Sequence, residues 1–411
     1  MEEPKNKKQK IIGEARKTKG GISYRCEHII PEKNRRCNMQ RKATNKFCSE
    51  HQILETEKRI PCPLDPKHTI WEKDLKSHMK KCNWKPKEEH DPWFELDKNC
   101  TLQNSEDFNL ENEETDEEVE LLIKYIPILQ GIKFEPLPIK QLQHDGMSTK
   151  FDVKLMQKHI TQQSSLIENL KSLDLLNANT FYMEFGCGRA ELSKFVQQCI
   201  VYDQPKDSKG YGYGLIDRGV NRYKCDNHLL KETDLEPIVK RSRMDIKDLN
   251  LDKFIDDKSV NHVVTISKHL CGAATDLTLK SIFNSNETNS KFDGMIVAMC
   301  CRHLCQLDQL LPQSRKYLHD QGFKTIQSFN VLKKMVSWAV DSSRKENDEH
   351  ISGLNKDERK DLGLKARRLI DESRVFAIQQ ILSNSYQVDL FHYVDTSITL
   401  ENNCLSIKRL S

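Results

Sequence analysis

The 411-residue chain lacks the long apolar runs that membrane proteins need. No stretch approaches the roughly 18 uncharged apolar residues of a membrane span. The first ten residues are charged and offer no apolar segment for a signal peptide. Hydrophobic residues make up only 37% of the chain, against 31% charged residues. We therefore expect a soluble intracellular protein, in the nucleus, the cytoplasm or both, with two to three domains joined by charged segments.

The net charge of +4 conceals an uneven distribution. Residues 1–90 hold 23 Lys and Arg against 13 Asp and Glu, whereas residues 91–120 hold one Lys against 12 acidic residues. The basic head predicts a polyanion partner, although a merely solvated lysine-rich terminus is the alternative. Residues 1–21 are predicted to be a basic disordered tail. Residues 91–120 are predicted to be a disordered acidic linker, with an acidic helix as the alternative.

Fourteen cysteines in an unsecreted chain argue for metal or thiol chemistry rather than for disulfides. His78 and Cys82 are four residues apart on a short helix predicted over residues 69–82, so they point the same way. The proline-bounded turn after Cys62 can present Cys62 and His68 opposite them. Two thiolates and two imidazoles complete a closed tetrahedral zinc site. We predict that residues 55–90 form a zinc finger of the CHHC type whose metal supplies folding stability.

A second zinc module of the CCCH type is predicted over residues 22–54, from Cys26, Cys37, Cys48 and His51. Its spacing is looser, since only Cys48 and His51 are close in sequence. The alternative for both clusters is a scatter of surface cysteines and histidines. Arginines and lysines separate the ligands of the first cluster, which is typical of zinc modules that contact phosphate; they are Arg25, Lys33, Arg35, Arg36, Arg41, Lys42 and Lys46.

Residues 121–411 alternate short apolar runs with helical periods, as expected for an α/β, Rossmann-like domain. Strands are predicted over residues 180–185, 213–216, 243–246, 260–267 and 294–299. Helices are predicted over 152–176 and, after a tight turn at 186–192, to about residue 199. Two further strands, over 386–394 and 397–405, are predicted to form an antiparallel edge on an otherwise parallel sheet.

The segment Glu184-Phe-Gly186-Cys-Gly188 lies at a predicted strand-to-helix turn, where glycines let the backbone approach a ligand closely. A dinucleotide site would have glycine or alanine at the position of Glu191, and a carboxylate near a helix N-terminus disfavours pyrophosphate. S-adenosylmethionine carries no phosphate and tolerates acidic neighbours. Glu184, Gly186 and Gly188 are therefore predicted to bind this cofactor.

Two acidic residues at the ends of the next strands support the same cofactor. Asp217 ends the second predicted strand, where a carboxylate can accept hydrogen bonds from both ribose hydroxyls. Asp245 lies at the third, where it can accept from the adenine amino group. The alternative is that Asp217 and Asp245 only cap helices.

Reactive side chains follow the fourth and fifth predicted strands. Lys268, His269 and Cys271 come after the fourth, and Cys300 and Cys301 after the fifth. Because ligands bind at the carboxyl ends of strands in open α/β sheets, these groups face the place where a methyl donor meets its acceptor. Each cysteine alone is more often a small buried hydrophobe.

Taken together, these motifs resemble the eukaryotic tRNA 2'-O-methyltransferases that modify the ribose of the fourth nucleotide of the acceptor stem. The similarity covers nearly the whole chain outside the linker. Its specific parts are the CHHC cluster and the block Lys-His-Leu-Cys-Gly at 268–272, supported by Met-Cys-Cys-Arg-His at 299–303 and by residues 158–167 and 366–374. The same finger type occurs in a minor-spliceosome protein, so the finger alone indicates RNA. Cys187 departs from the small residues of relatives in the glycine turn.

The resemblance implies a Rossmann-like S-adenosylmethionine-dependent methyltransferase domain behind two zinc modules with two Zn²⁺ ions, acting on tRNA. A ribose hydroxyl is a weak acid, and Lys268 and His269 are the candidates for the group that activates it. Two alternatives remain. A cysteine nucleophile, Cys271 or Cys301, could add to a pyrimidine before methylation at carbon 5. The chain could also be a non-catalytic zinc-containing RNA-binding protein.

Overall fold

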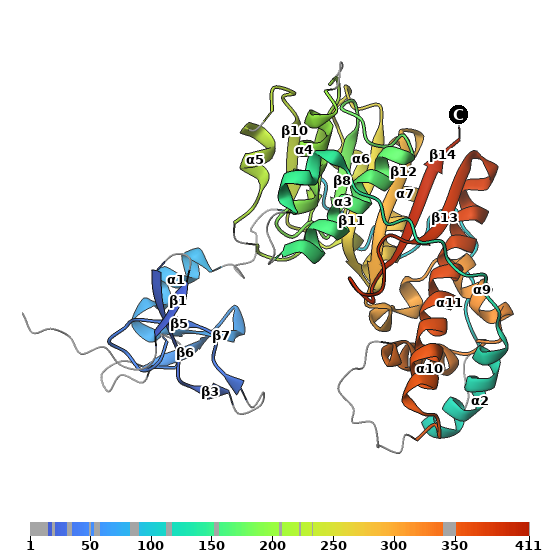
Figure 1. Ribbon diagram of the computed structural model, residues 1–411, viewed down its shortest axis with the longest axis horizontal. Helices are drawn as coiled ribbons and strands as arrows, with labels where there is room; N and C mark the ends of the chain where they lie inside the picture. Colours follow the sequence, from blue (N-terminus) through green and yellow to red (C-terminus); the bar gives the residue numbers. More distant parts are fainter. Residues whose placement is uncertain are drawn as a thin grey trace, which may run out of the picture. The chain divides into compact units, whose positions relative to one another are not determined.

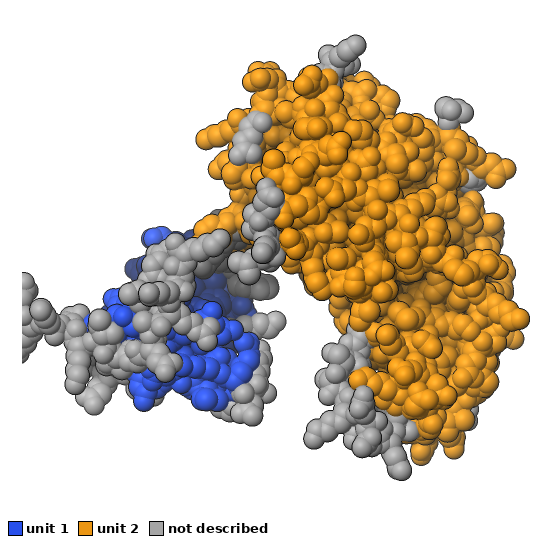
Figure 2. All heavy atoms as spheres, in the orientation of Figure 1, with its two compact units in different colours: residues 1–89 blue, residues 90–411 orange. Residues whose placement is uncertain are grey.

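The computed structural model divides the chain into two compact units, residues 1–89 and residues 90–411 (Figures 1 and 2). The structure describes residues 15–18, 21–30, 35–48, 51–52, 58–82, 90–111, 117–151, 156–204, 208–221, 223–231, 233–339 and 351–410.

The first unit consists of small antiparallel sheets. Strand β1 (Ala15–Thr18) pairs with β2 (Gly21–Arg25), which pairs with β5 (Gln40–Arg41), while β3 (Ile29–Ile30) pairs with β4 (Arg35–Arg36). A hairpin of β6 (Arg59–Cys62) and β7 (Asp65–Trp71) precedes helix α1 (Leu75–Lys81). Among its described residues the buried apolar side chains are five cysteines and Ile70. So little buried apolar surface cannot hold the unit together without metal.

Two predictions for this unit are corrected by the structure. Residues 15–18 are part of a sheet rather than of a disordered tail, because β1 pairs with β2 over four residues. The remainder of the predicted tail lies outside the described residues, apart from Gly21 at the start of β2. The helix predicted from residue 69 begins only at Leu75, since Thr69 and Ile70 pair with β6.

A seven-stranded sheet forms the centre of the second unit, in the order β10-β9-β8-β11-β12-β14-β13. Strands β8 (Phe181–Phe185), β9 (Gly212–Ile216), β10 (Ile238–Ser242), β11 (Val263–Cys271) and β12 (Phe292–Cys300) are parallel. Strands β13 (Tyr386–His392) and β14 (Asn403–Arg409) are antiparallel, so the predicted edge is confirmed. From β8 the chain adds β9 and β10 on one side, and it then adds β11 and β12 on the other side. The strand order therefore reverses between β8 and β11, and ligands bind at the carboxyl ends of strands beside such a switch point.

Helices pack on both faces of the sheet (Figure 1). One apolar cluster joins the sheet to α3 (Gln157–Ser172) and α4 (Glu191–Tyr202); the other joins it to α6 (Leu251–Phe254), α7 (Ala273–Phe283) and α11 (Lys356–Leu382). A third cluster joins α2 (Glu118–Gly131), α9 (Pro312–Asp320) and α10 (Ile326–Trp338) to the first half of α11. Short helices α5 (Asp226–Lys231) and α8 (Asn286–Ser290) complete the unit. None of the described helices combines the length and apolar composition needed to cross a membrane.

Several predicted boundaries are wrong. The third strand ends at Ser242, before the predicted 243–246, and Asp245 caps a short 3-10 turn at Ile246–Asp248. Strand β11 continues through Cys271, since pairing with β12 resumes beyond a bulge after Ser267. Lys268, His269 and Cys271 therefore belong to the strand and do not follow it. The last strand begins at Asn403 instead of at residue 397. The helix predicted from residue 152 begins at Gln157, and residues 152–155 lie outside the described part.

The predicted linker is wrong for residues 91–111, which are part of the second unit and pack on its other segments. Trp93 donates from Nε1 to the hydroxyl of Ser242 at 2.9 Å. Asn99 is 1% exposed and donates from Nδ2 to the carbonyls of Ile246 and Leu249 at 2.7 and 2.8 Å. The acidic composition of the segment predicted disorder because it gives no sign of these two side chains, which attach the segment to the domain. Helix α2 already begins at Glu118, while residues 112–116 lie outside the described residues.

Replacing Asn99 tests whether this segment is part of the fold. Asn99→Ala leaves two buried carbonyls without their donor, and we expect the free energy of unfolding to fall by about 2–4 kcal/mol. Denaturant unfolding of the full chain measures the change, with Asn109→Ala, an exposed residue of the same segment, as the control. Equal stability of the two variants would restore the linker interpretation.

Candidate functional site

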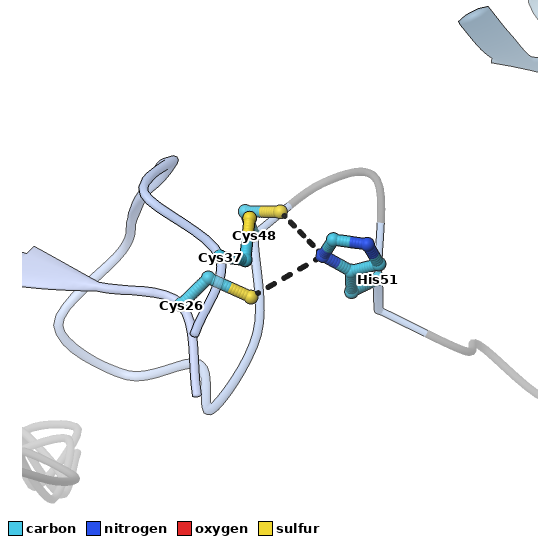
Figure 3. Close-up of side chains that lie close together, drawn as sticks. All are labelled: Cys26, Cys37, Cys48 and His51. Atoms are coloured by element: carbon cyan, nitrogen blue, oxygen red, sulfur yellow. Dashed lines mark hydrogen bonds between the residues drawn. The ribbon is translucent and has the colours of Figure 1, made fainter. Parts of the chain in front are cut away.

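The first cluster brings four ligand atoms together from separate turns (Figure 3). Nδ1 of His51 lies 3.5 Å from Sγ of Cys26 and 3.3 Å from Sγ of Cys48, and Cys37 completes a group within 4.8 Å. All three cysteines are buried. Pairing of β3 with β4 brings Cys26 and Cys37 together, which explains how ligands with loose sequence spacing converge.

The second cluster has the dimensions of a tetrahedral zinc site. Zinc bond lengths of roughly 2.3 Å to sulfur and 2.0–2.1 Å to nitrogen imply ligand separations of ~3.8 Å for S···S, ~3.6 Å for S···N and ~3.3 Å for N···N. The Sγ atoms of Cys62 and Cys82 are 3.7 Å apart, and the Nε2 atoms of His68 and His78 are 3.2 Å apart. Sγ–Nε2 distances are 3.2 Å for Cys62 and His78 and 3.8 Å for Cys82 and His68. The four ligands therefore fit one Zn²⁺ ion.

A carboxylate orients one of these imidazoles. Oδ2 of Asp65 lies 3.2 Å from Nδ1 of His68. A hydrogen bond from Nδ1–H to this carboxylate leaves Nε2 free to bind the metal, as is usual for zinc-binding histidines. The sequence prediction missed Asp65, although its place three residues before His68 puts it in reach.

The predicted glycine turn connects β8 to α4. Gly186 and Gly188 have φ angles of +63° and +50°, which side chains disfavour. Asp217, directly after β9, accepts hydrogen bonds from the backbone N–H groups of Gly188 at 2.7 Å and Gly219 at 2.6 Å. Its carboxylate therefore holds two loops at the carboxyl edge of the sheet. This role is additional to the predicted contact with a ribose.

A cavity of about 550 Å³ opens beside this turn, large enough for much of a nucleoside-sized ligand. It brings together Gly186, Asp217, Asp245, His269 and Cys271 from four strand ends. Its other described lining residues are Ile216, Arg218, Met244, Ile246, Lys247, Leu270, Ala273, Ala274, Leu277, Leu304, Gln306 and Gln309. Four of the predicted site residues thus meet in one hollow. A larger cavity of about 680 Å³, between α11 and the β13–β14 connection, contains neither the glycine turn nor these acids.

Glu184 occupies a different position from the one predicted. It is 4% exposed, accepts hydrogen bonds from the backbone and hydroxyl of Ser193 on α4, and is absent from the described residues that line the cavity. Burial raises its pKa to about 7, although the bonds from Ser193 favour the charged form. Through these contacts Glu184 connects β8 to the start of α4.

His269 lines the cavity, whereas Lys268, the residue before it in β11, is absent from the described lining and contacts α3 instead. Nζ of Lys268 is 3.2 Å from Nδ1 of His159 on α3, and burial lowers the pKa of the lysine. The pKa of His269 is lowered to about 4. Burial away from water is the largest cause, and the charges of Lys268 and His159 add to it. The sequence prediction did not single out His159, although it lies in the block 158–167 that contributes to the resemblance.

A buried ion network supports this edge of the sheet. Arg302, just after β12, pairs with Asp371 at 2.8 Å, and Arg374 pairs with Asp276 at 2.8 Å. The four side chains are 0–1% exposed. They join the segment after β12 and helix α7 to α11. The sequence prediction quoted the block 366–374 without a role, and this network supplies one.

The raised pKa of Glu184 predicts a pH-dependent stability. In the unfolded chain the carboxyl loses its proton near its usual 4.5, whereas in the folded protein it does so at about 7. Because the folded state binds more protons in this window, its stability falls as pH rises from about 4.5 to 7. Glu184→Gln cannot ionise and should lack this fall. Thermal unfolding of both proteins at pH 5, 6 and 7 tests the difference, and parallel curves would contradict it.

Comparison with known proteins identifies three matching family models. "Methyltransferase TRM13" matches residues 161–408, "CCCH zinc finger in TRM13 protein" matches residues 24–52, and "U11-48K-like CHHC zinc finger" matches residues 59–83. The two zinc clusters described above fall within the finger matches, and their ligand sets are the predicted ones. The matched methyltransferase region contains the glycine turn and both acids of the cavity.

Curated relatives match over almost their entire length. The proteins named "tRNA:m(4)X modification enzyme TRM13" from Scheffersomyces stipitis and Debaryomyces hansenii are 49% and 50% identical, over 92% and 93% of this chain and 98% and 91% of theirs. The Saccharomyces cerevisiae protein of that name is 33% identical over 94% of this chain and 96% of its own. A solved structure of the plantazolicin methyltransferase BpumL in complex with SAH matches 71% of this chain and 99% of its own, with a TM-score of 0.25 and 8% identity.

The family models confirm the two predicted zinc fingers before a methyltransferase domain, and the sheet order confirms the predicted α/β class. The cavity between the glycine turn, Asp217 and Asp245 fits S-adenosylmethionine, and the two clusters fit two Zn²⁺ ions. The chain belongs to the TRM13 methyltransferase family.

Proposed function

We propose that the protein transfers a methyl group from S-adenosylmethionine to the ribose 2'-hydroxyl of the fourth nucleotide in the acceptor stem of tRNA. The relatives' shared name, "tRNA:m(4)X modification enzyme TRM13", supports tRNA as the substrate. The observation that carries the choice of a hydroxyl as acceptor is that His269 lines the cavity, with Lys268 next to it in β11 and paired with His159.

The donor supplies an electrophilic methyl group, so the protein's task is to hold the acceptor oxygen and remove its proton. Lys268 suits the second task because burial lowers its pKa and increases the fraction of neutral amine. His159, 3.2 Å from its ammonium nitrogen, can take up the proton or orient the amine. His269 lines the cavity itself and can position the hydroxyl. We assign Lys268 as the general base and His269 as the orienting group.

Basic residues of the zinc head supply the contacts with phosphate. Arg35, Arg36, Lys42 and Lys46 are exposed around the first zinc cluster. Arg41 differs, because it is buried and donates to the backbone carbonyls of Arg25 and Asn45. Exposed cations on a small rigid module suit recognition of double-stranded RNA through its phosphates and shape.

A second candidate function rests on Cys271, which is exposed and lines the donor cavity. A thiolate there could add to a pyrimidine ring before methylation at carbon 5. This chemistry requires a covalent protein–RNA intermediate, whereas direct attack by a ribose hydroxyl forms none.

Asp217→Ala should weaken binding of S-adenosylhomocysteine at least tenfold. The change removes charged hydrogen bonds, each worth about 1.5–3 kcal/mol, and releases the turn at Gly188. Calorimetry measures the dissociation constant, with Asp234→Ala as a control at an exposed acid outside the cavity. If both variants bind as tightly as the original protein, the donor site has been misplaced.

Analysis of the methylated product tests the proposed function. The purified protein, tRNA and S-adenosylmethionine should yield, after nuclease digestion and mass spectrometry, a 2'-O-methylated nucleotide from position 4. Lys268→Ala should lower the rate by about 10²–10⁴, the range typical of a removed general base, while Lys258→Ala on an exposed loop should not. A methyl group on a base, together with a trapped adduct on 5-fluoropyrimidine tRNA, would establish the cysteine mechanism instead. Absence of any product would favour the RNA-binding alternative.

A further inference from the structure

Three cysteines converge at the carboxyl edge of the central sheet. Cys271 is the last residue of β11, Cys300 is the last residue of β12, and Cys301 follows it. The parallel register pairs Cys271 directly with Cys300. The three sulfur atoms lie within 4.8 Å of one another, the same separation that encloses the four ligands of each zinc finger. Cys271 and Cys300 are 29 positions apart in sequence, so the sheet register brings them together.

The backbone at Cys301 explains how two consecutive cysteines share one point. Successive side chains of a strand point to opposite faces, which would separate the sulfurs of Cys300 and Cys301. Cys301 instead has φ 50° and ψ 46°, in the left-handed region that residues with a side chain disfavour. This reversal breaks the alternation. Backbone strain of this kind is concentrated at functional sites, where the surrounding structure holds it in place.

The three cysteines differ in how far they are exposed to solvent. Cys300 is buried, Cys301 is half-buried, and Cys271 is exposed and lines the donor cavity. Structural zinc sites are closed by four protein ligands, as in the two fingers, whereas sites that bind a further ligand have three and keep one position open. Among the described residues this group supplies three thiols, with the open side at Cys271.

The sulfur spacing requires one small adjustment. Sγ of Cys271 and Sγ of Cys300 are 3.0 Å apart, whereas two thiolates on one zinc ion are separated by ~3.8 Å. Cys300 is held in the core, but Cys271 is exposed and its side chain can rotate towards the cavity. Zinc held by three thiolates carries a net charge of about −1, which is compatible with a positively charged methyl donor in the same cavity.

We propose that Cys271, Cys300 and Cys301 bind a third metal ion, Zn²⁺, whose open coordination position faces the methyl-donor cavity. Soft thiolate ligands select zinc over the hard cations magnesium and calcium. The fourth ligand is water or an oxygen of a molecule bound in the cavity. This site is independent of the finger ligands in the first unit and rests on no assumption about the methylated atom.

Counting metal ions in the full-length protein tests the proposal. Mass spectrometry of bound metals after dialysis should find three zinc ions per chain. Cys271→Ser should hold two, and so should Cys82→Ser, which opens the second finger; the double variant should hold one. Cys100→Ser is the matched control, because Cys100 is half-exposed and lies outside the three clusters, and it should hold three. Thermal unfolding of each variant verifies that it is folded.

Two ions in the original protein, with no further loss in Cys271→Ser, would overturn the proposal. So would an intact mass lower by two hydrogens together with two ions, which would show a disulfide between Cys271 and Cys300. Replacement of zinc by Co²⁺ tests the open position: adding S-adenosylhomocysteine should change the visible absorption of the Cys82→Ser protein but leave that of Cys82→Ser/Cys271→Ser unchanged. Identical responses would mean that the ion does not face the cavity. The metal counts depend on neither methyl transfer nor donor binding, so the proposed function can fail without affecting them. The Co²⁺ measurement also requires S-adenosylhomocysteine to bind, which the calorimetry on the original protein checks separately.

Discussion

The carboxyl edge of the sheet, where the cavity lies, depends on two buried ion pairs. Arg302 pairs with Asp371, and Arg374 pairs with Asp276. Four charges leave water here, and each is compensated by a close partner. Asn403 at the start of β14 also donates to Asp371 at 2.7 Å. Loss of one partner from such a pair typically costs about 3–5 kcal/mol, because the other charge stays buried. The network therefore fixes α7, α11 and the segment after β12 in one arrangement, with Cys300 and Cys301 directly beside it.

The two units obtain their stability in different ways. The second unit buries three apolar clusters, two of them against the sheet, so hydrophobic burial stabilises it. The first unit buries little besides the cysteines that form its metal sites. Metal binding and folding are therefore one process in the first unit.

The sequence predicted the motifs whose chemistry is local. The CHHC ligands lie within 21 residues, and the glycine turn within five, so spacing alone indicated their roles. The third strand was misplaced because the apolar residues after it are buried without being in a strand: Met244 lies before a 3-10 turn and Ile246 begins it. The predicted linker was wrong for a related reason. Composition averages over a segment, but a few anchors such as Trp93 and Asn99 determine whether it packs.

The sequence by itself determined the class of the fold and the two clusters of candidate zinc ligands, because these follow from local spacing and strand periodicity. It also predicted that Gly186, Asp217 and Asp245 lie together, as they do around the cavity. Only the tertiary structure decided the partners across the sheet. His159 meets Lys268 from 109 residues away, Cys271 meets Cys300 through the register of β11 and β12, and Glu184 faces α4 instead of the cavity. The physical reason is that parallel pairing and helix packing join positions whose separation in sequence carries no periodic signal.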